Sequence, residues 1–140
     1  MTDQKSCVLL AERHHDLRDG IRGLLETTFE TVFMVANEAS LLEGAERLRP
    51  AVVVIDISLS GGDLAGFLAR VFERAPGSKV LLVSVHDEAT VAEAALKAGA
   101  DGLVLKRNLG TDLMPAVDEL LAGRRYVSPA ILARGGNGAT

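Results

Sequence analysis

The sequence predicts an α/β protein built on an open parallel sheet with helices on both faces. Five short apolar runs recur along the chain and lack the alternation of a half-exposed strand. Continuous apolar runs of this length are typical of parallel strands that are buried on both faces. The segments between the runs are long enough for helical crossovers, so we expect a βα unit repeated five times.

The five predicted strands are rich in Val, Leu and Ile. In chain order they are CVLLA (7–11), TVFMVA (31–36), AVVVID (51–56), KVLLVSV (79–85) and GLVLK (102–106).

The helices between them are predicted from apolar spacing and end signals. In the first helix, over 16–29, one face carries Leu17, Ile21, Leu24 and Leu25. In the fourth, over 87–99, one face carries Val91, Ala94, Ala95 and Ala98. We expect Asp87 to cap that helix and Gly99 to end it. The last helix, near 112–123, contains Pro115, which we expect in the first turn because N–H groups there lack partners anyway.

Composition indicates one ordinary globular domain of 140 residues, with 48% hydrophobic and 24% charged residues. A formal net charge of −4 offers no support for binding nucleic acid or an anionic membrane. The chain has no apolar run of membrane-spanning length, no signal-peptide pattern and one cysteine, Cys7, which we expect to be a buried free thiol. These features favour a cytoplasmic protein without membrane contact.

Polar residues stand at the carboxyl ends of four of the five predicted strands. They are Glu12-Arg13-His14, Asp56, Ser84 with His86-Asp87, and Lys106. Open α/β sheets place their sites beyond the carboxyl ends of the strands. A charged residue at one strand end is common, but this joint pattern indicates a site.

Four stretches resemble the receiver domain of two-component response regulators. They are LLAERHHDLRDGIRGLLE, VVVIDISLSGGDLAGF, VLLVSVHDE and ALKAGADGLVLKRNLGTDLMPAVDELLAGRRYVSP. The resemblance spans roughly residues 7–129 and is greatest to receivers that precede a LuxR-type helix-turn-helix. It implies a flavodoxin-like fold with strand order 2-1-3-4-5 and five helices.

The resemblance also implies roles for individual residues. Asp56 matches the aspartate that accepts a phosphoryl group from a kinase histidine, Lys106 the lysine that pairs with the phosphoryl oxygens, and Ser84 the hydroxyl that turns toward them. These roles agree with the chemistry, because attack on phosphorus needs cations and donors already in place. The resemblance thus predicts a regulatory phosphoacceptor, not an enzyme.

The predicted Mg²⁺ site departs from the family pattern. Its ligands would be Glu12, Asp56 and the main-chain carbonyl of Ser58, but Arg13 stands where the family has a second acid. A guanidinium cannot coordinate a cation. We therefore expect Mg²⁺ to bind weakly or not at all, and Arg13 either to fold inward onto Asp56 or Glu12, or to point into solvent. A transition-metal site at His14 and His15 is a minor alternative.

Two further departures concern signalling. Leu59-Ser60 replaces the Met-Pro usual after the phosphoacceptor, and Gly61 and Gly62 loosen that loop. Leu103 occupies the position of the aromatic switch residue that works with Ser84.

Three classes of function remain open. The favoured one is a phosphorylated receiver that shifts a protein-interaction surface. The second is a phosphorylation-independent pseudo-receiver that serves as a dimerisation or docking module. The third is a flavodoxin-like enzyme that binds a nucleotide or flavin at the same edge.

The resemblance implies a sensor histidine kinase as partner, and a homodimer for which Leu103, Leu109 and Leu113 are candidate exposed contacts. DNA would be contacted only through an output domain outside this chain. We expect the receiver domain over 1–128, and a flexible tail or linker remnant over 129–140.

Overall fold

The computed structural model describes residues 7–131, which fold around a parallel sheet. The sheet order is β2-β1-β3-β4-β5-β6, and each neighbouring pair is parallel. The strands are β1 (Cys7–Ala11), β2 (Thr31–Val35), β3 (Val52–Asp56), β4 (Lys79–Ser84), β5 (Gly102–Leu105) and β6 (Tyr126–Val127). The predicted order 2-1-3-4-5 is confirmed, and the short β6 extends the sheet beyond it.

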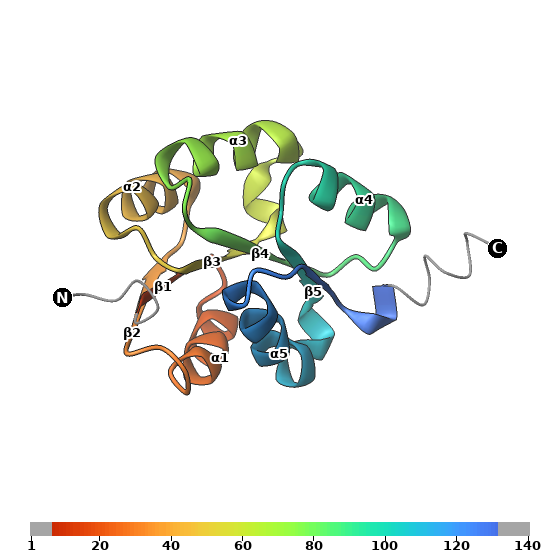
Figure 1. Cartoon of the computed structure of the whole chain (residues 1–140), viewed down its shortest axis with the longest axis horizontal. Coiled ribbons are helices and arrows are strands. Elements are labelled where there is room, and N and C mark those ends of the chain that lie inside the picture. Colours follow the sequence, from red (N-terminus) through yellow and green to blue (C-terminus); the bar gives the residue numbers. More distant parts are fainter. Residues whose placement is uncertain (1–6, 132–140) are drawn as a thin grey trace.

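Helices cover both faces of the sheet. They are α1 (His15–Leu25), α2 (Glu38–Leu48), α3 (Leu64–Arg74), α4 (Ala89–Lys97) and α5 (Leu109–Leu121). Helices α2, α3 and α4 lie on one face, and α1 and α5 on the other (Figure 1). Short 3-10 turns follow two of the strands, η2 (Ile57–Ser60) after β3 and η3 (Lys106–Asn108) after β5.

The core consists of two apolar clusters, one on each face of the sheet. Every residue of β3 is buried, as expected for a central strand covered on both faces. In α1, Ile21 and Leu25 are buried, while Leu17 and Leu24 pack at the margin of the cluster. The predicted apolar face of α1 is therefore confirmed.

Some predicted helix details are wrong. Helix α4 begins at Ala89, so Asp87 is not its cap and instead accepts a hydrogen bond from Arg107 at 2.9 Å. Ala94 is exposed, whereas Ala95 is buried as predicted. Gly99 does follow the end of α4, with a positive φ of 103° that favours glycine.

Pro115 lies in the interior of α5 and not in its first turn. The helix begins at Leu109, earlier than predicted, because the 3-10 turn η3 leads directly into it. The proline ring therefore removes one main-chain donor from the middle of the helix.

The proposed dimer leucines are buried in the core. Leu103 and Leu113 are 0% exposed and Leu109 is 7% exposed. Their prediction as exposed contacts is wrong, since each points from β5 or α5 into one of the two apolar clusters.

The chain after α5 packs back onto the sheet edge. Strand β6 pairs with β5, and Ser128 accepts a hydrogen bond from the Leu105 N–H and donates one to Asp112. Ile131 is 2% exposed, although it lies beyond the predicted domain boundary at 128. That boundary stays a prediction, and the tail over 132–140 lies outside the described residues.

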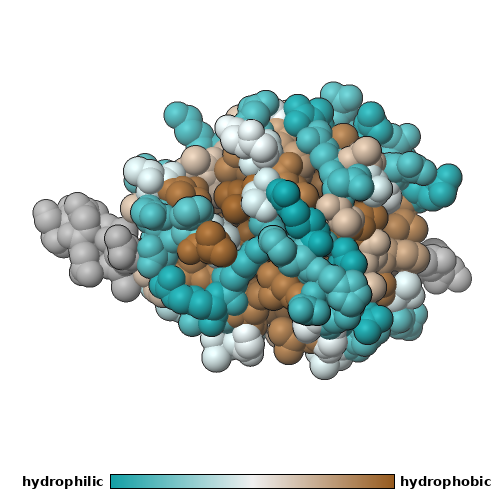
Figure 2. Space-filling model, turned by 180° about the vertical axis from the view of Figure 1, so that it is seen from behind, coloured by the Kyte–Doolittle hydropathy of each residue, from teal (hydrophilic) through white to brown (hydrophobic). Residues whose placement is uncertain are grey.

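Apolar atoms on the rear face lie in separate patches between hydrophilic ones (Figure 2). Across the described part of the chain, none of the helices has the length and hydropathy to cross a membrane. Cys7 is a half-buried free thiol, and burial raises its pKa.

Candidate functional site

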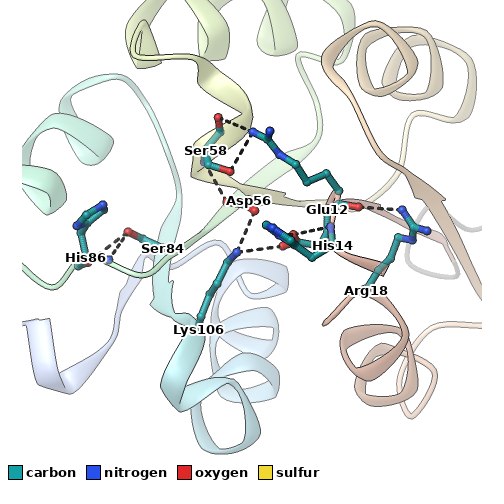
Figure 3. Close-up of polar contacts among 9 residues, drawn as sticks. Glu12, His14, Arg18, Asp56, Ser58, Ser84, His86 and Lys106 are labelled. Carbon is teal, nitrogen blue, oxygen red and sulfur yellow. Dashed lines mark hydrogen bonds and ion pairs between the residues drawn. The ribbon is translucent and has the colours of Figure 1, made fainter. Parts of the chain in front are cut away.

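The polar residues predicted at the strand ends meet at one edge of the sheet (Figure 3). Asp56 is the last residue of β3 and Glu12 directly follows β1, and these side chains are 2% and 1% exposed. Lys106 follows β5 and reaches across to both carboxylates. Because parallel strands end at the same edge, residues far apart in sequence form one site.

Lys106 is the cation that pairs with the buried acids. Its Nζ lies 2.9 Å from Asp56 Oδ2 and 3.5 Å from Glu12 Oε1. The lysine is 17% exposed, so the ion pair lies at the rim of the core and not deep within it. Two buried carboxylates thus share one lysine.

Asp56 is held in its ionised form. Burial would raise its pKa, but a hydrogen bond from the Ser58 main-chain N–H and the contact with Lys106 lower it, and the net result is a pKa below the ordinary value. The Ser58 N–H donates to Asp56 Oδ1 at 2.9 Å, while Lys106 donates to Oδ2. An ionised carboxylate in this setting can act as a nucleophile.

Arg13 is exposed at the opening of the site, as in the second of the two predicted alternatives, and its guanidinium also contacts the loop after β3. Its Nη2 donates to the Ser58 carbonyl at 3.2 Å and to the Ser58 hydroxyl at 3.4 Å. The structure shows no contact of Arg13 with Asp56 or Glu12 among the described residues, so the predicted inward contact with either acid is wrong. The side chain is exposed and reaches the loop after β3 instead.

Glu12 is oriented by residues that the sequence did not single out for this role. Its Oε2 accepts from the His14 main-chain N–H at 3.1 Å and lies 2.9 Å from His14 Nδ1. Arg18 donates to the Glu12 main-chain carbonyl at 3.0 Å. The only sequence signal for these contacts with Glu12 was the presence of His14 and Arg18 shortly after it in the chain.

An acidic cluster with metal-ligand spacing is present. One ligand atom from each of Glu12, His14 and Asp56 lies within 4.8 Å of the others. Glu12 Oε1 is buried and makes no hydrogen bond among the described residues, although it lies 3.5 Å from Lys106 Nζ, so this oxygen could also coordinate a metal ion. However, the Ser58 carbonyl, the third ligand expected from the sequence, already accepts from Arg13. The donor set therefore fits a divalent cation only in part.

Ser84 faces its own loop and not Asp56 (Figure 3). Its buried hydroxyl accepts from the His86 N–H at 2.9 Å and donates to the His86 carbonyl at 3.3 Å. To reach a group on Asp56, the hydroxyl has to give up both contacts. Leu103, the other predicted switch residue, is fully buried in the core.

A groove beside Asp56 gives access to the site. It has a volume of about 590 Å³ and lies between η2 and the start of α4. Asp56 and Lys106 lie at its polar end, and Val85, Val91 and Ala94 form part of its apolar wall. A donor group can therefore approach Asp56 through this groove.

The comparison with protein families matches this arrangement. Residues 8–118 match the family described as response regulator receiver domain. The chain belongs to this family. Receivers are regulatory phosphoacceptor domains and not enzymes, which excludes the flavodoxin-like enzyme considered above. Receivers also typically bind Mg²⁺.

Two relatives support the same placement. The receiver is 27% identical over 133 residues to the transcriptional regulatory protein DegU of Brevibacillus brevis, covering 94% of this chain and 56% of DegU. It is 31% identical over 131 residues to the probable transcriptional regulatory protein NarL of Mycobacterium tuberculosis, covering 92% of this chain and 61% of NarL. The chain thus spans somewhat over half the length of these relatives.

Solved structures show the same fold. The receiver superposes with a TM-score of 0.86 on a LuxR-family two-component response regulator from Aurantimonas sp. SI85-9A1, at 26% identity over 96% of this chain and 98% of that one. The receiver is thus similar to regulators of the LuxR and NarL type.

Proposed function

We propose that Asp56 accepts a phosphoryl group from the phosphohistidine of a sensor histidine kinase in the cytoplasm. The observation that carries this proposal is the ionised Asp56 at the end of β3, paired with Lys106 and accessible through the groove. The names of DegU and NarL support a role in transcription regulation, with DNA contacted through an output domain outside this chain.

In the proposed transfer, a carboxylate oxygen of Asp56 attacks phosphorus. A P–O bond to Asp56 forms while the P–N bond to the kinase histidine breaks, and the histidine leaves with its electron pair and takes up a proton. Negative charge on the phosphoryl oxygens is stabilised by Lys106, which already lies 2.9 Å from Asp56. The Ser84 hydroxyl then turns from the His86 loop toward the phosphoryl group, and this movement shifts the interaction surface.

The proposal includes weak metal binding, because Arg13 competes for one of the expected ligands. The Ser58 carbonyl accepts from Arg13, and Arg13 brings a positive charge to the mouth of the site. Bound Mg²⁺ would supply positive charge next to the phosphoryl oxygens, held by Glu12 and Asp56. Arg13→Asp frees the carbonyl and adds a carboxylate, so we expect Mg²⁺ to bind at least roughly tenfold more tightly, as when a supporting group of a metal site is restored.

Labelling by acetyl phosphate tests the proposal. The wild-type protein should gain one phosphoryl mass slowly in the presence of Mg²⁺, and Arg13→Asp should gain it faster. Asp56→Asn should abolish labelling in both backgrounds. Arg125→Asp, a charge reversal at an exposed arginine away from the site, serves as the matched control and should label like the wild type.

A phosphorylation-independent pseudo-receiver is the second candidate function. It is favoured by the Arg13 contact, which holds the loop after β3 without a phosphoryl group, and by Leu103, which is already buried. Failure of the wild-type protein to label, while Arg13→Asp labels at Asp56, would favour this second function. Labelling of the wild type as fast as Arg13→Asp would refute the role assigned to Arg13.

A further inference from the structure

Strand β2 forms one edge of the sheet and leaves a set of main-chain groups open. Among residues 7–131 it pairs only with β1. The Val35 carbonyl accepts from the Glu12 N–H at 3.0 Å, so Val35 directs its main-chain groups toward β1. Because successive residues of a strand alternate in direction, Thr31 and Phe33 do the same, while Val32 and Met34 direct their N–H and C=O groups outward.

The sequence of this edge lacks the usual protection against pairing. Edge strands are commonly blunted by charged residues, proline or bulges, although a short strand is itself a partial protection. Strand β2 reads TVFMV and contains no charge and no proline. Phe33 is 38% exposed and is one of two large hydrophobic residues exposed in the described part of the chain.

A groove accompanies the exposed phenylalanine. It has a volume of about 420 Å³ and lies between β2 and α2, where Phe33, Leu9 and Leu48 line it. Gly44 of α2 approaches Leu9 so closely that a Cβ there would lie 3.3 Å from the leucine side chain. Apolar surface at the edge is therefore continuous with the core face of the sheet.

We propose that β2 pairs antiparallel with β2 of a second copy of this chain, across a two-fold axis at Phe33. Val32 then lies opposite Met34 of the second copy, and these residues exchange the outward N–H and C=O groups. Phe33 lies opposite its own equivalent in a non-hydrogen-bonded pair, where side chains approach closely. The two sheets become one continuous sheet with α2 of each copy on the same face.

Two features of the chain are complementary to a second copy. The pairing sets Glu30 opposite Ala36, so no like charges meet along the strand. On α2, Glu43 and Arg47 line the groove, are exposed and form no ion pair among the described residues. The two-fold axis makes the α2 helices antiparallel, which brings Glu43 of each copy toward Arg47 of the other. A strand from an unrelated protein would not supply this reciprocal charge pair.

Disulfide trapping tests the register. In a Cys7→Ser background, Phe33→Cys should form a symmetric disulfide, since non-hydrogen-bonded partners lie about 4.5 Å apart at Cα, within the range that disulfides need. Val85→Cys is the matched control, because Val85 is the other exposed large hydrophobic residue in the described part of the chain and directly follows β4. Trapping of Phe33→Cys but not Val85→Cys supports the proposal, and equal or absent trapping of Phe33→Cys overturns it.

Sedimentation tests the interface without a covalent bond. The wild-type chain should form dimers over a concentration series that reaches the millimolar range, and Phe33→Glu should weaken dimerisation. Arg47→Glu should also weaken it, and Glu43→Arg combined with Arg47→Glu should restore it. A strict monomer, or dimerisation that is unchanged by Phe33→Glu, would refute the β2 pairing.

Discussion

Removal of the shared lysine should destabilise the fold, because two buried carboxylates depend on it. Lys106→Met keeps most of the length of the side chain but removes the charge beside Asp56 and Glu12. Unit charges about 4 Å apart attract by about 4 kcal/mol at an effective dielectric constant near 20. Removal of one partner of a buried pair costs about 3–5 kcal/mol, and the partial exposure of Lys106 places the expected loss at about 3 kcal/mol.

Urea denaturation at pH 7 and pH 5 measures this loss. In the variant, burial and the neighbouring acid should raise the pKa of Asp56 above that of the unfolded chain. The folded variant then takes up a proton as the pH falls, so its stability deficit relative to the wild type should be smaller at pH 5 than at pH 7.

Two variants control for other causes. Lys97→Met removes an exposed lysine of α4 and should change stability by less than about 0.5 kcal/mol. Addition of Glu12→Gln to Lys106→Met should recover part of the loss, because one of the uncompensated charges is gone. A deficit below about 1 kcal/mol, or one that is equal at both pH values, would show that the carboxylates do not depend on Lys106.

Two further predictions concern the C-terminal connection and acid stability. Ser128→Ala leaves the Leu105 N–H without its acceptor and should lower the free energy of unfolding by about 1–3 kcal/mol in urea denaturation. Thr27→Ala, the control, removes an exposed hydroxyl contact and should lower it by less than about 0.5 kcal/mol. Equal effects of the two variants would contradict the role of Ser128. Because the pKa of Asp56 is lower in the folded than in the unfolded chain, its contribution is fully present at neutral pH and is lost as the pH falls below about 4 toward the folded-state pKa. Asp56→Asn should flatten the acid limb of stability against pH, and an unchanged limb would contradict this assignment.

The main chain was more predictable from the sequence than the direction of individual side chains. Apolar runs locate the five long strands because most strands of a parallel sheet are covered by helices, although the edge strand β2 is only partly buried. Strand ends locate Glu12, Asp56 and Lys106. The leucines of β5 and α5 were misjudged, because an apolar residue is compatible with either a core or an interface. The direction of Arg13 depends on several rotatable bonds and on the position of the Ser58 carbonyl, which local sequence does not specify.

The charge balance of the site suggests how Arg13 participates in the proposed switch. Glu12 and Asp56 are two buried acids and Lys106 supplies one positive charge, so the charge of Arg13 brings these four side chains to formal neutrality. Arg13 donates to the Ser58 carbonyl, and the Ser58 N–H donates to Asp56, so the guanidinium contacts the same loop residue that holds Asp56. A phosphoryl group on Asp56 adds further negative charge, which attracts the guanidinium more strongly than a neutral carbonyl does. We therefore expect phosphorylation to draw Arg13 from Ser58 toward Asp56. The loop after β3, released from Arg13, would then move together with Ser84 and shift the interaction surface. Arg13→Asp replaces the attraction between the guanidinium and the phosphoryl group with repulsion. The labelling rate of this variant should therefore increase more with Mg²⁺ concentration than the labelling rate of the wild type.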